Sequence, residues 1–249
     1  MRHMFSHWSE LSDRLARSSQ IALFLDFDGT LAPIQSRPET VRVVPGIRST
    51  LTALARRRGV RVWVISARRR ADIRARVRVP GVRYLGLYGW ERTRIWPSRP
   101  GVIAGVRQAL GARLPRHPAV WIEDKEYTLA VHYRGAPDAI RMAALECVYH
   151  AVEPLRSELR IALGKCVWEV VPLIMGNKGA AVRREMAALP SSTLPLYIGD
   201  DLSDESAFAA LSPVVGIRVG GPEFTRARYR LDSPEQVHRF LDRLRRQNL

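Results

Sequence analysis

Two aspartates one residue apart, Asp26 and Asp28, end an apolar run in the segment IALFLDFDGTLAP. Carboxylates can act as nucleophiles, move protons or bind metal ions, and an i, i+2 pair can serve two tasks if the chain leaves the strand between them. Gly29 permits such a turn. The segment IGDDLSD, far along the chain, adds three more carboxylates: Asp200, Asp201 and Asp204. The chemistry therefore depends on whether the two acidic segments meet.

Several carboxylates in one crevice repel one another unless a cation offsets their charge. A hard divalent ion with oxygen ligands does so most simply, and Mg²⁺ is the expected ion. A bound Mg²⁺ can also shield a phosphate from the same carboxylates, so that an anionic nucleophile can approach an anionic substrate. These residue types therefore predict phosphoryl chemistry.

Strands and helices alternate along most of the chain, which predicts a parallel sheet with helices packed on it. An amphipathic helix is expected near the amino terminus, followed by strands at 21–26, 61–66, 82–89, 193–201 and 214–219 and helices at 44–59, 67–79, 178–189, 203–211 and 233–246. Ligands of open parallel sheets bind at the carboxyl ends of the strands. The polar residues expected to converge there are Asp26, Asp28, Thr30, Ser66, Asp200, Asp201 and Asp204.

The alternation changes between the third and fourth of these strands. A loop at 91–101 is expected there, then a helix at 101–114, strands at 120–125 and 127–134, a helix at 137–155, and strands at 159–164 and 166–172. Helix, hairpin, helix and hairpin describe a small antiparallel α+β layer. We therefore expect a discontinuous core domain at 1–96 and 171–249, with an inserted domain at 97–170.

Four motifs occur in the order and context of the haloacid dehalogenase superfamily, which the chain resembles: DFDGT, a serine after the next strand, a lysine that opens a later helix, and GDDLSD. Within it, the chain is similar to trehalose-6-phosphate phosphatases in LDFDGTLAPI, IEDKEYTLAVHYR, WEVVP with NKGAAV, and IGDDLSDESAF. The resemblance covers most of residues 21–211. It implies a Rossmann-like α/β core with an inserted cap, and Mg²⁺-dependent hydrolysis of trehalose 6-phosphate to trehalose and phosphate in trehalose biosynthesis.

The resemblance also implies roles for single residues. Asp26 matches the nucleophile that forms an aspartyl-phosphate, and Asp28 matches the group that protonates the departing sugar oxygen and then deprotonates water. Ser66 and Lys178 would hold the phosphoryl oxygens. The Asp26 carboxylate, the Asp28 backbone carbonyl and Asp200 would bind Mg²⁺, with Asp201 and Asp204 as further ligands or as groups that orient them.

Substrate-binding positions are expected in both domains. The core would contribute Thr30, Arg68, Tyr88 and Gly89. In the cap, Glu123 and Lys125 are two apart on an expected strand and so share a face, and Glu169 stands in the last cap strand. The matching family residues hydrogen-bond sugar hydroxyls, although an exposed cross-strand ion pair is the commoner use of such residues. Only three of 40 basic residues are lysines, which favours a specific use for Lys125 and Lys178.

Three departures from the family pattern concern the substrate more than the chemistry. Ala67 follows Ser66 where the family has glycine, Tyr88 precedes Gly89 where it has histidine, and Val171 precedes Pro172 where it has arginine. The alternative substrate is therefore another sugar phosphate or a glycosyl-phosphoglycerate.

The net charge of +16 is the one feature that favours another class, a noncatalytic basic protein that binds nucleic acid. The arginines of this chain are spread along its whole length and fit ordinary solvated helix faces, so no specific nucleic-acid site is expected. No apolar segment is long enough for a signal peptide or a spanning helix, and the two cysteines fit a reducing compartment, so a cytoplasmic protein without a membrane partner is expected. The resemblance leaves open whether a trehalose-phosphate synthase delivers the substrate.

Overall fold

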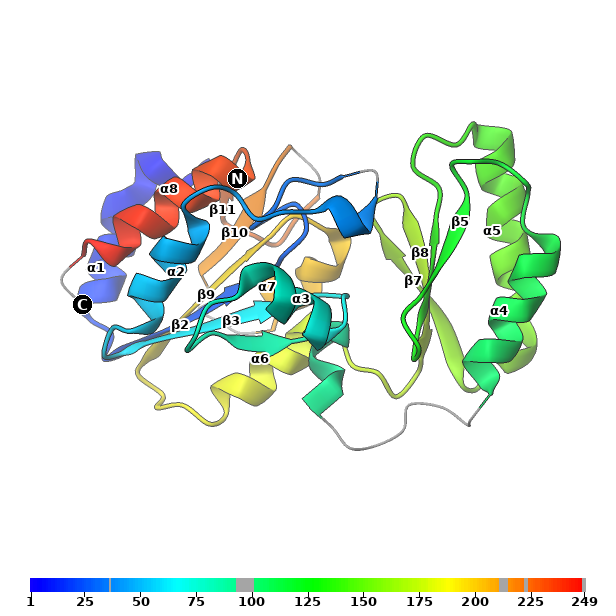
Figure 1. Ribbon diagram of the computed structural model, residues 1–249. Helices are drawn as coiled ribbons and strands as arrows, with labels where there is room; N and C mark the ends of the chain where they lie inside the picture. Colours follow the sequence, from blue (N-terminus) through cyan, green and yellow to red (C-terminus); the bar gives the residue numbers. More distant parts are fainter. Residues whose placement is uncertain (36, 93–100, 211–214, 222–223, 248–249) are drawn as a thin grey trace. The chain divides into compact units, whose positions relative to one another are not determined.

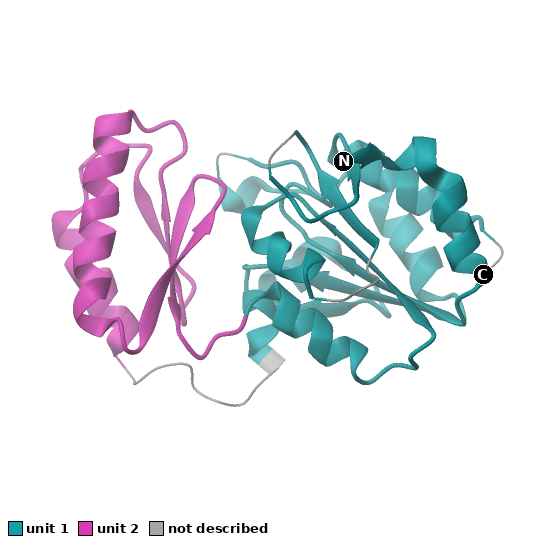
Figure 2. Ribbon diagram, turned by 180° about the vertical axis from the view of Figure 1, so that it is seen from behind, with its two compact units in different colours: residues 1–92, 177–249 teal, residues 93–176 magenta. Residues whose placement is uncertain are grey.

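The computed structural model describes residues 1–35, 37–92, 101–210, 215–221 and 224–247. The chain divides into two compact units (Figure 2): the first comprises residues 1–92 and 177–249, the second residues 93–176. The expected boundary at 96/97 lies outside the described residues. At the other boundary the second unit extends six residues beyond the expected 170, because the strand that ends at Pro172 pairs within it.

The first unit is built on a parallel sheet of seven described strands in the order β1-β11-β10-β9-β2-β3-β4. The strands are β1 (Arg2–His3), β2 (Gln20–Leu25), β3 (Val60–Ile65), β4 (Arg83–Leu85), β9 (Thr193–Gly199), β10 (Val215–Val219) and β11 (Tyr229–Leu231). Strand β2 pairs with β3 on one side and with β9 on the other. The carboxyl ends of these three strands are therefore neighbours.

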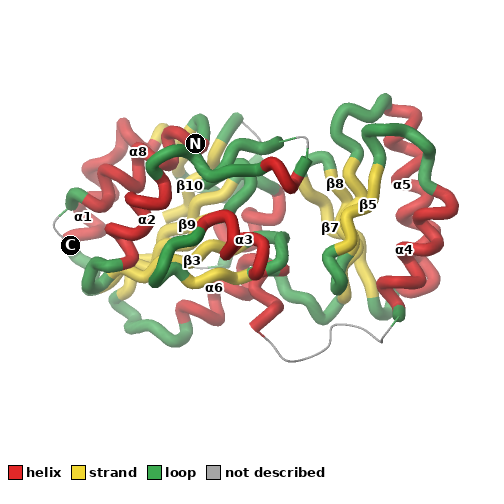
Figure 3. Tube along the Cα trace, viewed as in Figure 1, coloured by secondary structure: helices red, strands yellow, loops and turns green. Residues whose placement is uncertain are grey.

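Helices cover both faces of this sheet, as the near-continuous apolar strands require. Alternate residues of β2 enter different clusters: Leu23 packs with α1 (Trp8–Ala16), α2 (Ile47–Ala55), α3 (Arg70–Val77) and α8 (Pro234–Arg245). Phe24 points to the other side, where it packs with α6 (Lys178–Met186) and α7 (Glu205–Phe208). Figures 1 and 3 show these helices around the sheet.

The second unit is an antiparallel sheet with two helices on one face. Its strands pair in the order β5-β6-β8-β7, with β5 (Trp121–Asp124), β6 (Leu129–His132), β7 (Leu159–Gly164) and β8 (Val167–Pro172). Helices α4 (Val102–Arg113) and α5 (Asp138–Val152) pack on the face that carries Leu129, Val131 and Trp168. Figure 2 shows this unit in magenta. The opposite face carries Glu123, Ala130 and Glu169, which stand in one row across three strands.

Several expected elements differ in the structure. The strand expected at 82–89 ends at Leu85. Short 3-10 turns follow at Leu87–Arg92, and they are interrupted at Tyr88 and Gly89, whose positive φ angles are not helical and cannot continue a strand. Strands β1 and β11 were not expected, since two or three residues are too short to show a period. The helix expected at 203–211 is a 3-10 turn (Leu202–Asp204) followed by α7. Some expected positions lie outside the described residues: residue 211 of that helix, residue 214 of the next expected strand, and residues 93–100 of the expected loop.

In the described part of the chain, none of the helices has the length and apolarity needed to cross a membrane.

Candidate active site

Three neighbouring strands end in polar residues at the same edge of the parallel sheet. Asp26 follows β2, Ser66 follows β3 and Asp200 follows β9, and all three are buried. After Asp26 the chain turns at Gly29, whose φ is +77°. A Cβ atom on Gly29 would stand 2.0 Å from Asp200 Oδ2, so the Asp200 carboxylate lies directly against this turn. The two acidic segments therefore meet, as the parallel topology predicts.

The ammonium group of Lys178 joins two of the buried carboxylates. Lys178 Nζ donates to Asp26 Oδ1 at 2.6 Å and to Asp204 Oδ1 at 2.7 Å. Burial alone would lower the pKa of Lys178, but Asp204 and Asp26 more than offset it and raise that pKa. Burial raises the pKa of Asp26 well above its usual range, and Asp204 and Asp200 raise it further against the opposing effect of Lys178. The carboxylates of Asp26, Asp200 and Asp204 thus carry more negative charge than the Lys178 ammonium group offsets.

Both carboxylate oxygens of Asp204 accept hydrogen bonds. Besides Lys178, its Oδ1 accepts the hydroxyl of Tyr197 at 2.6 Å, and its Oδ2 accepts the backbone N–H of Asp201 at 2.8 Å. The Asp201 side chain accepts the Leu202 backbone N–H at 2.7 Å. It also accepts the Asp204 backbone N–H, which completes a capping box for the short turn. Burial raises the pKa of the Tyr197 hydroxyl well above its usual value, followed by the repulsion of Asp204 and Asp26, so Tyr197 remains a donor. Asp201 and Asp204 thus fix the loop after β9.

The acidic cluster fits a divalent cation. Oxygen atoms of Asp26, Asp200 and Asp204 lie within 4.8 Å of one another. Carboxylate oxygens are the ligands that Mg²⁺ prefers, and Mg²⁺ commonly takes only one or two of them and keeps several waters. Because the oxygens of Asp204 are committed to hydrogen bonds, Asp26 and Asp200 are the better ligands. Added positive charge would also offset the repulsion that raises the pKa of Asp26.

Asp28 is engaged by an arginine rather than by the cluster. Arg68 Nε donates to Asp28 Oδ2 at 2.7 Å and Nη2 donates to Oδ1 at 2.9 Å, which is a bidentate pair. Burial alone would lower the pKa of the guanidinium, but Asp28 and Asp72 raise it. Arg68 was expected to bind substrate; in the structure its guanidinium contacts Asp28.

The other expected core residues lie at or behind the strand ends. Ser66 Oγ accepts the backbone N–H of Arg68 at 3.1 Å, which leaves its own proton available for donation. Thr30 is fully buried, and its hydroxyl has no hydrogen-bond partner in the described part of the chain. Tyr88 joins the site through its backbone N–H, which donates to the Ser66 carbonyl at 3.0 Å. Gly89 is packed against Ala181 of α6, where a Cβ would stand 2.7 Å from that methyl group.

The expected residues of the second unit lie on the sheet face opposite its helices. Lys125 follows the end of β5, and its Nζ donates to Glu169 Oε1 at 2.6 Å. Glu123 Oε2 lies 2.9 Å from His132 Nε2 across the β5-β6 pair. The structure thus brings Lys125 and Glu169 together, with Glu123 in the same cross-strand row as Glu169.

Three residues of these networks, Tyr197, Asp72 and Arg76, lie outside the sequence motifs. Asp72 accepts from Arg68 Nη1 at 2.9 Å and from Arg76 Nε at 2.8 Å. The spacing of Arg68, Asp72 and Arg76 by four residues was a signal for these ion pairs, because the sequence predicts a helix at 67–79. In the structure the helix begins at Arg70, so Arg68 precedes it and only Asp72 and Arg76 lie on α3. Tyr197 carried no such signal, since a tyrosine in a buried strand is usually a packing residue.

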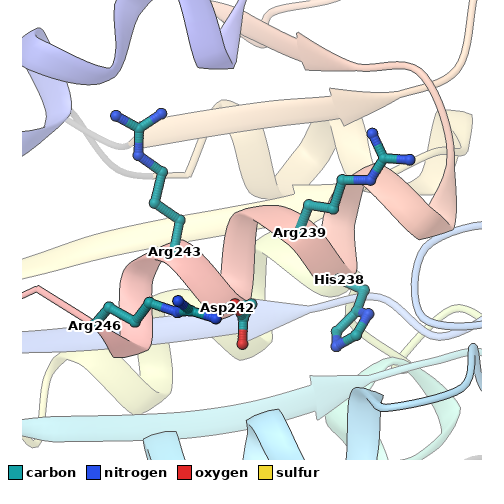
Figure 4. Close-up of a pocket in the computed structure, with 5 residues that line it drawn as sticks. All are labelled: His238, Arg239, Asp242, Arg243 and Arg246. Carbon is teal, nitrogen blue, oxygen red and sulfur yellow. Dashed lines mark ion pairs between the residues drawn. The ribbon is translucent and has the colours of Figure 1, made fainter.

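One surface hollow of about 370 Å³ lies on α8, away from these residues. Figure 4 shows the residues that line it: His238, Arg239, Asp242, Arg243 and Arg246. Asp242 accepts from Arg246 at 2.7 Å, and the guanidinium of Arg243 stacks 4.2 Å from the Trp8 ring centroid. Much of this basic surface is therefore paired within the protein.

Comparison with solved structures places the fold among the haloacid dehalogenase-like hydrolases. A hydrolase of this class from Bacteroides thetaiotaomicron is 14% identical, with a TM-score of 0.64 over 90% of this chain and 99% of that one. The C-terminal domain of C. albicans trehalose-6-phosphate phosphatase is 22% identical, with a TM-score of 0.79 over 95% and 96% of the two chains. The expected α/β core with an inserted α+β layer is confirmed.

The trehalose-phosphatase family matches residues 24–235, and the chain belongs to that family. The trehalose-phosphate phosphatase of Mycobacterium tuberculosis is 35% identical over 259 residues, which cover 95% of this chain and 64% of that protein. The chain therefore spans slightly less than two thirds of the length of this relative. The family resemblance of the sequence motifs is confirmed.

Proposed function

We propose that this protein is a Mg²⁺-dependent phosphatase that hydrolyses trehalose 6-phosphate to trehalose and phosphate. The observation that carries the proposal is the convergence of Asp26, Lys178 and Asp200 at the ends of two neighbouring strands, within a chain of the trehalose-phosphatase family. The short supply of positive charge in this cluster fits a site that binds a cation.

The reaction has two steps. First, a carboxylate oxygen of Asp26 bonds to phosphorus while the bond from phosphorus to the sugar oxygen breaks, and Asp28 gives its proton to that oxygen. Second, water attacks the aspartyl-phosphate, Asp28 takes a proton from it, and the bond between Asp26 and phosphorus breaks. Asp28 therefore returns to its initial protonation state.

Other residues of the cluster stabilise the transferring group. Lys178 brings a buried ammonium group that can donate to phosphoryl oxygens, and Ser66 has an available hydroxyl proton. Asp26 and Asp200 would hold the Mg²⁺ ion, with the backbone carbonyl of Asp28. When bound, the ion neutralises charge on the phosphate and on the carboxylates.

We assign recognition of the sugar to the second unit, residues 93–176. The sheet face opposite its helices carries the Lys125–Glu169 pair and Glu123, which together offer ammonium donors and carboxylate acceptors. Trehalose presents many hydroxyl groups, each of which donates and accepts hydrogen bonds.

Phosphate release from trehalose 6-phosphate, measured beside other sugar phosphates and glucosyl-phosphoglycerate, tests this proposal. We expect a clear preference for trehalose 6-phosphate, activity that EDTA abolishes and Mg²⁺ restores, and no turnover by Asp26→Asn in a folded protein. Near-normal turnover by that variant would refute the nucleophile. Metal-dependent preference for a different ester would retain the mechanism and refute the substrate. The Tyr88 and Val171 departures from the family pattern would then be the first positions to test for substrate choice.

A further inference from the structure

We propose that Arg68 is a positioning residue that holds the Asp28 carboxylate in the orientation required for its proton transfers. The inference rests on the proposed function, because it assumes that Asp28 exchanges protons with the sugar oxygen and with water. It assigns to Arg68 a role that acts through Asp28 and not through contact with the substrate.

The first support is the geometry of the pair. Two nitrogens of one planar guanidinium reach both oxygens of Asp28, at 2.7 and 2.9 Å, and this fork restricts rotation of the carboxylate plane. A carboxylate offers about four acceptor positions, of which Arg68 takes two. The Asp28 side chain is 38% exposed whereas that of Arg68 is 9% exposed, so the arginine lies beneath and the outer side of the carboxylate stays accessible.

The second support is that Arg68 is itself fixed. Its Nη1 donates to Asp72, and its Nη2 also donates to the Pro38 carbonyl at 3.0 Å. Its guanidinium carbon lies 5.5 Å from the centroid of the Phe27 ring. Asp72 is fixed in turn by Arg76, which also donates to the Val41 carbonyl at 2.9 Å. Arg68 therefore connects Asp28 to α3 and to the segment around Pro38.

The third support concerns the donors of Arg68. A guanidinium has five N–H groups, and the bonds to Asp28, Asp72 and Pro38 use four of them. A phosphoryl oxygen would find at most one free donor, whereas an arginine that clamps phosphate commonly offers two parallel ones. The hydrogen-bond count thus favours a positioning role over a substrate contact.

Two substrates with different leaving groups test the proposal. Trehalose 6-phosphate loses a sugar oxygen that needs a proton, whereas p-nitrophenyl phosphate loses a stable phenolate that does not. For Arg68→Lys, which keeps the charge and removes the fork, we expect kcat/KM for trehalose 6-phosphate to fall at least about tenfold and kcat/KM for p-nitrophenyl phosphate to stay within about threefold. Arg74→Lys, the same change at an exposed site on the following helix α3, should alter neither value.

An equal loss on both substrates would overturn the proposal, because a general structural defect or a lost phosphate contact would affect both. Absence of phosphatase activity in the unaltered protein would instead refute the proposed function, so the two failures are distinguishable. Thermal unfolding by circular dichroism establishes that each variant is folded. If Arg68→Lys does not fold, Asp72→Asn takes its place. It should cause a smaller loss of kcat/KM, again larger for trehalose 6-phosphate than for p-nitrophenyl phosphate, and an equal loss on both substrates would count against the role.

A double-mutant cycle gives an independent readout on one substrate. If Arg68 acts only through Asp28, then Arg68→Lys should cause no further loss of trehalose 6-phosphate hydrolysis in an Asp28→Asn background. A second loss of tenfold or so, additive with the first, would show that Arg68 acts on the substrate directly.

Discussion

Replacement of Gly29 by alanine should disrupt the metal site more than it disrupts the fold. The added Cβ would stand 2.0 Å from Asp200 Oδ2, whereas ordinary contacts begin at 3.4 Å. The Asp200 carboxylate or the turn would have to retreat by about 1.4 Å, several times the tolerance of about 0.2 Å on a metal-ligand distance. The positive φ of +77° adds about 1–2 kcal/mol of backbone strain for any residue with a Cβ.

Gly59 provides a matched control for the backbone term. Its φ is +86°, and a Cβ there would meet only the Ser19 carbonyl oxygen at 3.4 Å. It precedes β3, at the opposite edge of the sheet from Asp200. Gly59→Ala should therefore lower the free energy of unfolding in urea by about 1–2 kcal/mol, because the folded state gains that strain, and it should retain normal metal binding.

The assay is Mg²⁺ titration by calorimetry together with phosphate release. For Gly29→Ala we expect Mg²⁺ affinity to fall by about 10- to 100-fold, by analogy with substitutions that displace a ligand's supporting groups. Turnover at saturating Mg²⁺ should fall by about 100-fold, since a misplacement of about 1 Å has that effect. Equal Mg²⁺ affinity and turnover in the two glycine variants would refute the reasoning that Gly29 sets the position of Asp200.

Three further predictions concern single side chains. Lys178→Met should abolish turnover and lower the free energy of unfolding in EDTA by about 3–5 kcal/mol, because it leaves buried carboxylates without their ammonium partner. Mg²⁺ should restore part of that stability. An unchanged urea midpoint would contradict this prediction. Lys125→Met should raise KM for trehalose 6-phosphate at least about tenfold with little effect on p-nitrophenyl phosphate, whereas Lys165→Met should leave both unchanged, and the sugar-binding assignment fails if the two variants behave alike. Burial raises the pKa of the Tyr84 hydroxyl, which exchanges hydrogen bonds with the Val79 backbone, so its contribution is fully present below the unfolded pKa of about 10 and is lost as pH rises through the folded value. Urea midpoints should accordingly decline above about pH 10, and less steeply in Tyr84→Phe; identical slopes would exclude Tyr84 as a source.

Local sequence determined the elements that carry the chemistry. The apolar run before Asp26 is long enough to specify a buried strand, and parallel topology then dictates that Asp26, Ser66 and Asp200 share one edge. Gly29 indicated a turn because few other residues accept a positive φ. These features follow from short-range periodicity and backbone sterics, which a sequence displays directly.

Tertiary structure alone decided which side chains touch. Strands β1 and β11 are formed by pairing with each other and with β10. Tyr197 reaches Asp204 because the chain turns back after β9 in the 3-10 turn Leu202–Asp204. Arg68 contacts Asp28 because the segment after β2 folds back beside α3 and places the Asp28 carboxylate within reach of its guanidinium. The Asp28–Arg68 pair joins residues 40 apart in sequence, and even the Tyr197–Asp204 pair depends on how the chain folds back after a strand. No local pattern encodes the directions in which these side chains point.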